Sequence, residues 1–147
     1  MKIALICSQG GHLSEMLCIK EAFESHDIFF VSYKNPRTKQ LHYKKYLVEE
    51  IGTNFWKMIK LFVKSFKILI KEKPKLIVST GSEIAIPFFI LAKLMGIQGI
   101  YIDSWCRAKT KSGTGRILYY FSDVFLVQWK NMVKVYGRRA RYKGVVI

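Results

Sequence analysis

A glycine-rich turn near the start of the chain holds residue types that bind phosphate and move protons. Ser8-Gln9-Gly10-Gly11-His12 follows an apolar run at residues 3–7 and precedes a segment with helical periodicity. Adjacent glycines let the backbone turn sharply and approach a ligand, and the N-terminus of a helix attracts anions such as phosphate. A histidine side chain such as that of His12 can take a proton from a hydroxyl group. The turn predicts either a phosphate site with a base beside it or an ordinary strand-to-helix turn with an exposed histidine.

Two more loops follow apolar runs in the same way. Thr80-Gly81-Ser82 follows residues 76–79, and the polar stretch 104–116 follows residues 99–103. In an open α/β sheet such loops meet at the carboxyl ends of the strands, where ligands bind. The basic side chains of the last loop suit a diphosphate, although an ordinary basic loop has the same composition. The expected substrate- and phosphate-binding residues are Ser8, Gly10, Gly11, Thr80, Gly81, Ser82, Arg107 and Arg116, with Lys109 and Lys111 nearby.

Three side chains are candidates for catalysis. His12 is the first candidate base, and its alternative role is a hydrogen bond to a phosphate or to the backbone. Asp103 ends a strand at the ligand edge and serves either as a base or as the cap of a turn. Glu15 lies one helical turn after His12 and either orients its ring or is a solvated helix residue.

The pattern of apolar runs and helical segments predicts the fold class. Continuous apolar strands alternating with helices indicate an α/β protein, a Rossmann-like parallel sheet with helices on both faces, formed as a single domain over residues 1–147. Residues 33–39 are expected as a loop and residues 145–147 as a strand cut short. The predicted strands are 2–7, 27–32, 46–51, 76–79, 99–103 and 124–127. The predicted helices are 12 to 23 or 24, 55–71, 84–95, 115–121 and 130–136.

Composition limits the partners and the compartment. The 147 residues include 25 Lys and Arg against 10 Asp and Glu, a net charge of +15 that implies nucleic acid, an anionic membrane or phosphorylated substrates. Half of the residues are hydrophobic, which excludes a disordered chain. Three cysteines without a Cys-x-x-Cys spacing predict reduced thiols and no metal site. No signal peptide and no transmembrane helix are expected, because no apolar stretch approaches the roughly 20 residues that span a bilayer.

The segment 55–71 has lysines at alternating spacings of three and four, which places them on one face of a helix. Large apolar residues occupy the opposite face. Such a helix either packs on the core with a solvated lysine face or contacts an anionic membrane. The expected membrane-contact residues are Phe55, Trp56, Lys57, Lys60, Lys64 and Lys67.

These motifs, in this order, also occur in a known family. Over nearly its whole length the chain resembles the membrane-associated, acceptor-side subunits of two-component GT-B glycosyltransferases. These include the eukaryotic subunit of the N-acetylglucosaminyltransferase that builds lipid-linked chitobiose. Closer still are bacterial capsular and exopolysaccharide proteins that accompany a β-1,4-galactosyltransferase subunit. The matching segments are residues 8–12 with Glu15, 80–82 with Pro87, 101–104, 112–116, 122–123 and 125–129, followed by Tyr136, Tyr142 and Gly144.

The resemblance implies the N-terminal half of a GT-B fold divided between two chains. The partner subunit would bind the UDP-sugar, UDP-galactose or UDP-GlcNAc, and no other cofactor is implied. This chain would bind the lipid-diphosphate-sugar acceptor and recruit the partner to the cytoplasmic face of an anionic membrane. Gln128 and Trp129 are expected either to contact the partner or to pack internally. The family commonly has Glu where this chain has the shorter Asp103.

Two features bear on the alternatives. No Asp-x-Asp motif occurs, so a metal-held nucleotide sugar is unsupported. The eukaryotic relatives carry an N-terminal membrane anchor, and here membrane attachment is expected from the basic amphipathic helix. The alternatives are a basic nucleic-acid-binding module, for which no RNP or helix-turn-helix signature is found, and a self-sufficient small nucleotide-binding enzyme. We therefore expect no nucleic-acid partner.

Overall fold

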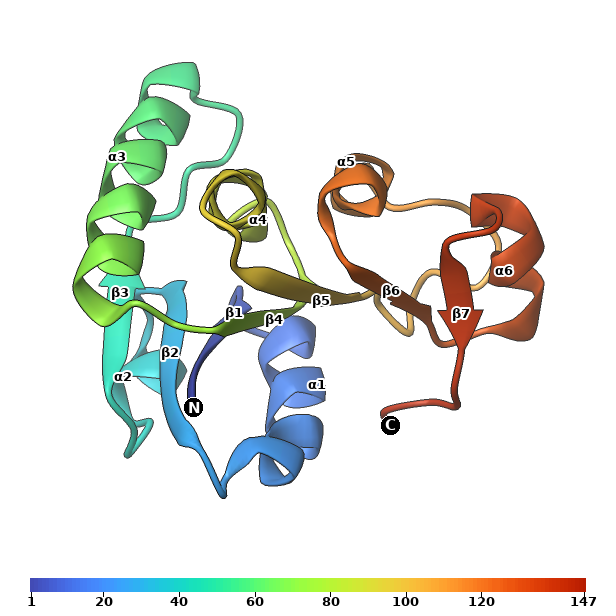
Figure 1. The fold of residues 1–147 in the computed structure, drawn as a ribbon, viewed down its shortest axis with the longest axis horizontal. Coiled ribbons are helices and arrows are strands. Elements are labelled where there is room, and N and C mark those ends of the chain that lie inside the picture. Colours follow the sequence, from blue (N-terminus) through green and yellow to red (C-terminus); the bar gives the residue numbers. More distant parts are fainter.

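A computed structural model describes residues 1–147 and contains one parallel sheet of seven strands in the order β3-β2-β1-β4-β5-β6-β7 (Figure 1). The chain starts in the middle of the sheet, builds outward to β3, and then crosses back to place β4 on the other side of β1. The direction of building therefore reverses between β1 and β4. The strands are β1 Lys2–Cys7, β2 Asp27–Tyr33, β3 Lys45–Val48, β4 Leu76–Gly81, β5 Gln98–Ile102, β6 Val124–Val127 and β7 Ala140–Tyr142.

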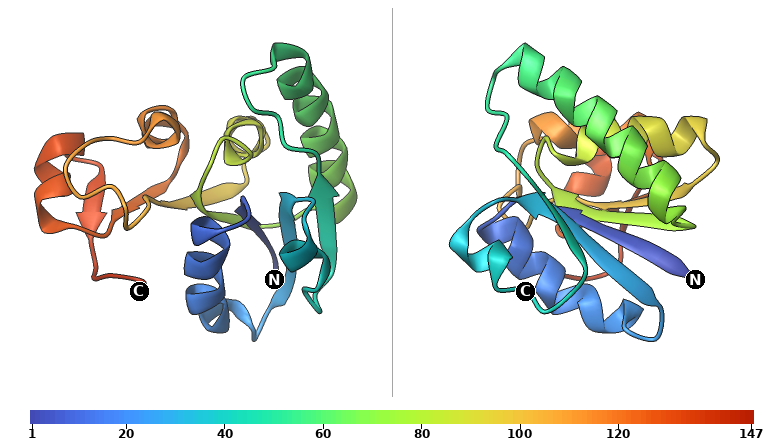
Figure 2. Two further views of the ribbon diagram at one scale, coloured as in Figure 1. Left: turned by 180° about the vertical axis from the view of Figure 1, so that it is seen from behind. Right: turned by 90° about the vertical axis from the view of Figure 1, so that its left-hand side faces the viewer.

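Helices cover both faces of the sheet, as predicted. Three helices, α3, α4 and α5, lie side by side on one face, and α1 lies on the other (Figures 1 and 2). The helices are α1 Gly11–Ile19, α2 Pro36–Lys39, α3 Phe55–Glu72, α4 Ala85–Leu94, α5 Gly113–Phe121 and α6 Lys130–Tyr136, with a 3₁₀ turn at Lys20–Phe23. None of these helices is both long and apolar enough to cross a bilayer.

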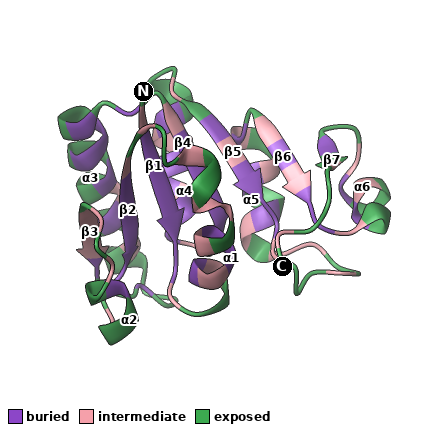
Figure 3. Cartoon of the chain, turned by 90° about the horizontal axis from the view of Figure 1, so that it is seen from below, coloured by how far each residue is buried: buried purple, intermediate pink, exposed green.

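The central strand β1 is buried on both sides, which explains its unbroken apolar sequence. Alternate side chains of a strand point to opposite faces. Ala4 and Ile6 therefore join the core under α3 and α4, whereas Leu5 and Cys7 join the core under α1. Figure 3 shows β1 and its neighbours as the buried centre of the molecule, with exposed residues on the outer faces of the helices.

Three local predictions are wrong. The first helix ends at Ile19 and continues only as a 3₁₀ turn. The expected loop 33–39 contains α2, because Asn35 and Thr38 form a reciprocal capping box at its start. The last strand is Ala140–Tyr142 rather than residues 145–147, because the edge of β6 is free to pair there, with Leu126 opposite Arg141.

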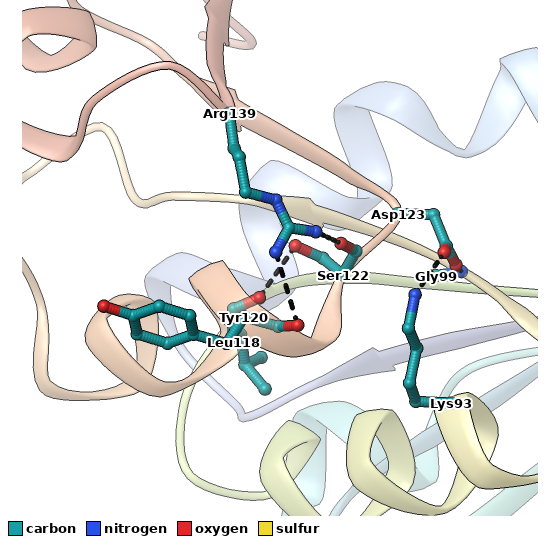
Figure 4. Close-up of polar contacts among 7 residues, drawn as sticks. All are labelled: Lys93, Gly99, Leu118, Tyr120, Ser122, Asp123 and Arg139. Atoms are coloured by element: carbon teal, nitrogen blue, oxygen red, sulfur yellow. Dashed lines mark hydrogen bonds and ion pairs between the residues drawn. The ribbon is translucent and has the colours of Figure 1, made fainter.

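The amino ends of β5 and β6 are joined by polar contacts around Ser122 and Asp123 (Figure 4). The Asp123 carboxylate accepts hydrogen bonds from Lys93 Nζ at 2.9 Å and from the backbone N–H of Gly99 at 2.8 Å. Arg139 donates to the carbonyl of Ser122 at 2.6 Å. Ser122 and Asp123, one of the segments that match the family, therefore hold the edge of the sheet opposite to the predicted ligand site.

Candidate functional site

A polar cleft of about 490 Å³ opens at the carboxyl ends of β1, β4 and β5. It covers the point where the strand order reverses, which is where open α/β sheets bind ligands. The three loops singled out in the sequence all contribute to it. Its lining residues are Ser8, Gly11, His12, Ser82, Glu83, Tyr101, Asp103, Ser104, Cys106, Arg107, Ser112, Gly113 and Thr114.

His12 is held in one tautomer by the neighbouring loop. Its Nδ1 lies 2.8 Å from the carbonyl oxygen of Thr80. Because a carbonyl only accepts hydrogen bonds, Nδ1 carries the proton, and Nε2 of the neutral ring has the free lone pair. The Thr80 hydroxyl donates in return to the His12 carbonyl at 2.7 Å. The ring is therefore oriented as a base is required to be, with Nε2 available to a substrate.

The loop after β4 has an unusual backbone that makes room for this ring. Gly81 has φ +127°, and a Cβ there would lie 2.6 Å from Cε1 of His12. Only glycine suits both the conformation and the close approach. The next residue, Ser82, also has a positive φ of 81°, which is strained for a residue with a side chain. Its hydroxyl donates to Glu83 at 2.7 Å.

Glu83 is a cleft residue that the sequence analysis did not select. Tyr33 donates to its carboxylate at 2.9 Å. Burial is the largest influence on its pKa and acts to raise it, but hydrogen bonds from Ser82, its own backbone N–H and Tyr33, with the nearby His12, bring the pKa below its usual value. An ionised carboxylate therefore lies close to the His12 ring. Its position directly after the Thr80-Gly81-Ser82 loop was the available signal.

Asp103 is buried behind the cleft and surrounded by hydroxyl groups. It accepts from Ser112 at 2.8 Å, from Tyr101 at 3.2 Å and from Tyr136 at 2.8 Å. Burial raises the pKa of this carboxyl group, while the three hydroxyl donors oppose that change. A Cβ at Gly115 would lie 2.2 Å from the Tyr136 hydroxyl, so this network requires glycine at the start of α5. The observed contacts give Asp103 the position of a clamp that joins the loop, α5 and α6.

Glu15 neither orients His12 nor lies in solvent, the two roles expected for it. Its side chain is buried and accepts from Ser104 Oγ at 3.1 Å and from the Trp105 backbone N–H at 3.2 Å. Its other oxygen accepts from Gln128 at 3.1 Å. Burial raises its pKa against these hydrogen bonds. Glu15 positions the loop after β5, and the Thr80 carbonyl takes the orienting role.

The prediction of a partner contact through the Gln128 side chain is wrong, because that side chain is only 2% exposed. Besides Glu15, its amide nitrogen donates to the carbonyl of Asp103, and its oxygen accepts from the Val146 N–H. Trp129 is half-buried and donates to the Trp105 carbonyl at 2.7 Å. A partner contact of Trp129 stays a prediction.

The remaining predicted binding residues divide into two groups. Ser8, Gly11, Ser82 and Arg107 line the cleft, and Gly10 lies beside it. Two others do not reach the cleft. The Thr80 side chain is fully buried and used by His12, and Arg116 lines a different cleft. Arg37, which the sequence analysis passed over, donates to the carbonyl of Gly10 at 3.3 Å and to Ser14 at 3.1 Å.

Three helices begin at the cleft: α1 at Gly11, α4 at Ala85 and α5 at Gly113. Each helix N-terminus carries the positive end of the helix dipole. In α4 the N–H groups of Ala85 and Ile86 already donate to the carbonyls of Ser82 and Glu83, so α1 and α5 are the helix ends left for a ligand. Arg107 adds a cation at the same place. This arrangement suits a ligand with several phosphate oxygens.

Comparison with known proteins bears on the family. Residues 38–146 match the family described as "Oligosaccharide biosynthesis protein Alg14 like". The chain belongs to this family. The human protein named "UDP-N-acetylglucosamine transferase subunit ALG14" is 35% identical over 89 residues, which cover 56% of this chain and 41% of the human protein. The mouse protein of the same name is 25% identical over 186 aligned positions, covering the whole chain and 83% of the mouse protein. The predicted membership in a family of glycosyltransferase subunits is confirmed.

Two solved structures show the fold of this Alg14-family chain. MurG of Acinetobacter baumannii superposes with a TM-score of 0.74 at 15% identity, covering 89% of this chain and 43% of MurG. The UDP-N-acetylglucosamine 2-epimerase of Rickettsia bellii gives a TM-score of 0.80 at 15% identity, covering 99% of this chain and 45% of the epimerase. The chain spans less than half of either protein. Its fold is thus the Rossmann-like half of a GT-B architecture, as predicted.

The α3 helix of this family member differs from the two-faced helix that was predicted. Leu61, Ser65, Ile68, Leu69 and Glu72 face the core. The large apolar residues split off as a second stripe that is exposed to solvent: Phe55, Trp56, Ile59, Val63, Phe66 and Ile70. The lysines form a third stripe beside it: Lys57, Lys60, Lys64, Lys67 and Lys71. Only the first stripe packs on the protein. Of the apolar side chains expected opposite the lysines, Leu69 fills the core, whereas Phe55, Ile59, Phe66 and Ile70 do not.

Proposed function

We propose that this chain is the acceptor-side subunit of a glycosyltransferase whose GT-B fold is divided between two polypeptides. The observation that carries the proposal is a single Rossmann-like sheet, matching under half of two-domain GT-B proteins, with a polar cleft at its carboxyl edge. The human and mouse relatives are named as subunits of a UDP-N-acetylglucosamine transferase. The proposed reaction class is transfer of a sugar from a UDP-sugar to a lipid-linked saccharide, and the proposed setting is capsular or exopolysaccharide synthesis.

The chemistry of the cleft fits the acceptor side of this reaction. The acceptor hydroxyl oxygen forms a bond to the anomeric carbon of the donor sugar while the bond to UDP breaks. His12 Nε2 takes the hydroxyl proton, and the charge that then forms on the ring is stabilised by the Thr80 carbonyl at Nδ1 and by Glu83. The diphosphate of the lipid carrier binds at the N-termini of α1 and α5 and at Arg107.

The partner subunit supplies the second Rossmann-like domain and most of the UDP-sugar site. It closes over the carboxyl edge of this sheet, which brings the anomeric carbon to His12. Without the partner, this chain binds the acceptor but has little or no transfer activity. With it, the two clefts form one active site that excludes water from the reacting groups.

The α3 helix attaches the chain to the cytoplasmic face of the membrane. Its apolar stripe is exposed along the whole helix, with Val63 51% exposed and Phe66 46% exposed. An interfacial helix buries such a stripe among acyl chains while its lysines meet anionic headgroups. Each lysine near the surface contributes about 1 kcal/mol. This attachment holds the acceptor cleft close to its lipid substrate.

The decisive experiment measures sugar transfer from labelled UDP-galactose and UDP-GlcNAc into the lipid fraction of source membranes. It compares this chain alone, the partner alone and both together. Product formed only with both, or far more with both, supports a divided enzyme. Full activity of the partner alone would contradict the proposal, and turnover by this chain alone would indicate a self-sufficient enzyme.

Membrane attachment is tested separately by flotation with vesicles. The chain should float with vesicles that contain anionic lipid and much less with zwitterionic vesicles. Val63→Asp should abolish flotation, whereas Ile117→Asp, at a comparably exposed apolar position on α5, should not. Equal flotation of both variants would show that α3 is not the attachment site.

A further inference from the structure

A second cleft, of about 270 Å³, lies beside the first between α5 and α6. It is lined by Lys111, Arg116, Tyr119, Tyr120 and Tyr136. No acidic side chain lines it. Neither cation takes part in any of the five ion pairs of the molecule. The cleft therefore presents two positive charges with no protein anion to neutralise them.

A thin wall separates the two clefts. The consecutive residues Lys111 and Ser112 line different clefts, and Ser112 donates to Asp103 behind the first one. Tyr136 presents its ring to the second cleft while its hydroxyl donates to Asp103 at 2.8 Å. The second cleft is thus a separate space that shares its rear wall with the candidate acceptor site.

Aromatic rings form the body of the second cleft. Tyr119 and Tyr136 are stacked with ring centroids 5.9 Å apart, and Tyr120 is 68% exposed although it is a large ring. Lys111 Nζ lies 5.4 Å from the centroid of Tyr136. Tyrosine presents an apolar ring together with a polar hydroxyl group. Such rings accommodate the C–H face of a sugar, while the cations accept a charged substituent.

We propose that this second cleft binds an anionic saccharide, meaning a sugar that carries a phosphate or a carboxylate group. The exposed ring of Tyr120 contacts the sugar, and Lys111 and Arg116 bind the anion, while the buried Tyr136 only lines the cleft. The inference concerns a site distinct from the acceptor cleft and does not depend on whether the chain takes part in sugar transfer. It assigns Arg116 to a second ligand rather than to the diphosphate predicted from sequence.

The test is a titration of the isotopically labelled full chain, followed by the amide signals of residues 111–120 and Tyr136. Four probes are used: methyl glucuronide, glucose phosphate, neutral methyl glucoside and inorganic phosphate. The two charged sugars should move these signals at about tenfold lower concentration than either the neutral sugar or phosphate alone, since both halves of the site contribute. If only methyl glucuronide moves these signals, the natural ligand carries a carboxylate group. If only glucose phosphate moves them, the natural ligand carries a phosphate group.

Matched variants locate the binding. Lys111→Gln and Arg116→Gln should each weaken binding of the charged sugars about tenfold, the loss of one charge-assisted hydrogen bond. Tyr120→Ala removes an exposed ring and leaves the core intact. This variant should also weaken binding of the charged sugars. Lys39→Gln is the control, because it removes one charge from an exposed position on α2, away from both clefts.

Three results would overturn the proposal. Charged sugars that bind no better than phosphate would show that the tyrosines contribute nothing. Shifts confined to residues 8–12 and 80–83 would place the ligand in the first cleft. Signals of residues 111–120 that respond to the partner subunit but to none of the four probes would make this surface a protein contact.

Discussion

The two edges of the sheet use their charges in opposite ways. At the amino edge, Glu72 is buried and pairs with Lys2 at 3.0 Å and with Lys44 at 2.7 Å, and Tyr46 donates to it as well. Asp123 pairs with Lys93 at the same edge. Each of the five ion pairs of the molecule lies at this edge, where strands begin and the preceding helices end.

At the carboxyl edge no ion pair forms. The buried carboxylates there, Glu15 and Asp103, are held by hydroxyl and amide groups, and Arg107 has no acidic partner. Ion pairs stabilise the amino edge of the sheet. At the carboxyl edge, cations without an acidic partner and helix N-termini remain for a ligand. The distribution of ion pairs thus separates the edge that holds the candidate cleft from the opposite edge, independently of any motif.

The largest effect is expected at the carboxyl edge, in the candidate cleft that holds His12. His12→Ala should lower sugar transfer by the proposed two-subunit enzyme about 10²–10⁴-fold, because the acceptor hydroxyl would lose the proposed base. His42→Ala is the matched control, since His42 is exposed and outside the cleft. Circular dichroism should show both variants folded. If His12→Ala were as active as the wild type, His12 would not be the base of the reaction.

The next largest effect is expected at the amino edge of the sheet, where Glu72 forms its ion pairs. Glu72→Gln should lower the free energy of unfolding by about 3 kcal/mol at neutral pH, as measured by urea denaturation. The lysines left behind are 31% and 55% exposed at the side chain, so water still solvates them and the loss stays at the low end for a buried pair. A loss as small as that of a surface ion pair would mean that this cluster does not hold the edge.

The pH dependence of the two edges should differ in sign. Hydrogen bonds from Lys44, Tyr46 and Lys2 outweigh burial, the largest single influence, and lower the pKa of Glu72 to about 2. Its stabilisation is complete above the unfolded value of about 4.5 and is lost as the pH falls towards 2. The pKa of Glu15 is instead raised by burial, so its contribution falls as the pH rises. The cost of Glu72→Gln should therefore grow with pH, and that of Glu15→Gln should shrink.

A smaller effect tests the clamp behind the cleft. Gly115→Ala places a methyl group 2.2 Å from the Tyr136 hydroxyl and should cost about 2 kcal/mol of unfolding free energy, because Tyr136 must leave Asp103. Gly113→Ala, in open space two residues earlier in the same helix, should cost nothing. Thermal denaturation of the pair measures the difference, and similar melting temperatures would show that the clamp is easily displaced.

The smallest effect concerns Arg37, which secures the glycine turn from α2. Its two hydrogen bonds are exposed, so Arg37→Gln should cost less than about 1 kcal/mol of global stability. Local opening should increase instead, which hydrogen exchange of the amides of residues 10–14 would detect. Lys39→Gln on the same short helix should leave that exchange unchanged.

Local patterns predicted most of the elements because the responsible forces act over a few residues. Pro74 ends α3 after Glu72, and the glycine turn begins α1, as expected from backbone geometry. The alternation of apolar strands and helices was enough for the fold class. The missed α2 depends on a capping box, a local signal that was overlooked.

Other errors had a different origin, because they concern partners that are distant in the sequence. Gln128 and Glu15 are 113 positions apart, yet they bury each other's polar groups. β7 forms at residues 140–142 because β6 offers an unpaired edge there, not because its own residues are strongly apolar. In α3, the helical period of the sequence placed the lysines and the apolar residues on different faces. It could not show which of the apolar residues the neighbouring elements would cover.

The amino-acid sequence by itself determined the alternating α/β order, the excess of positive charge and the glycine turn that carries His12, since these depend on local geometry and composition. Only the tertiary structure decided which groups meet. It oriented His12 with a carbonyl 68 positions away, separated Arg116 from Arg107, and left one stripe of α3 in solvent. The reason is physical: a cleft is formed by loops brought together through the pairing order of strands, and that order is fixed by burial of the whole sheet.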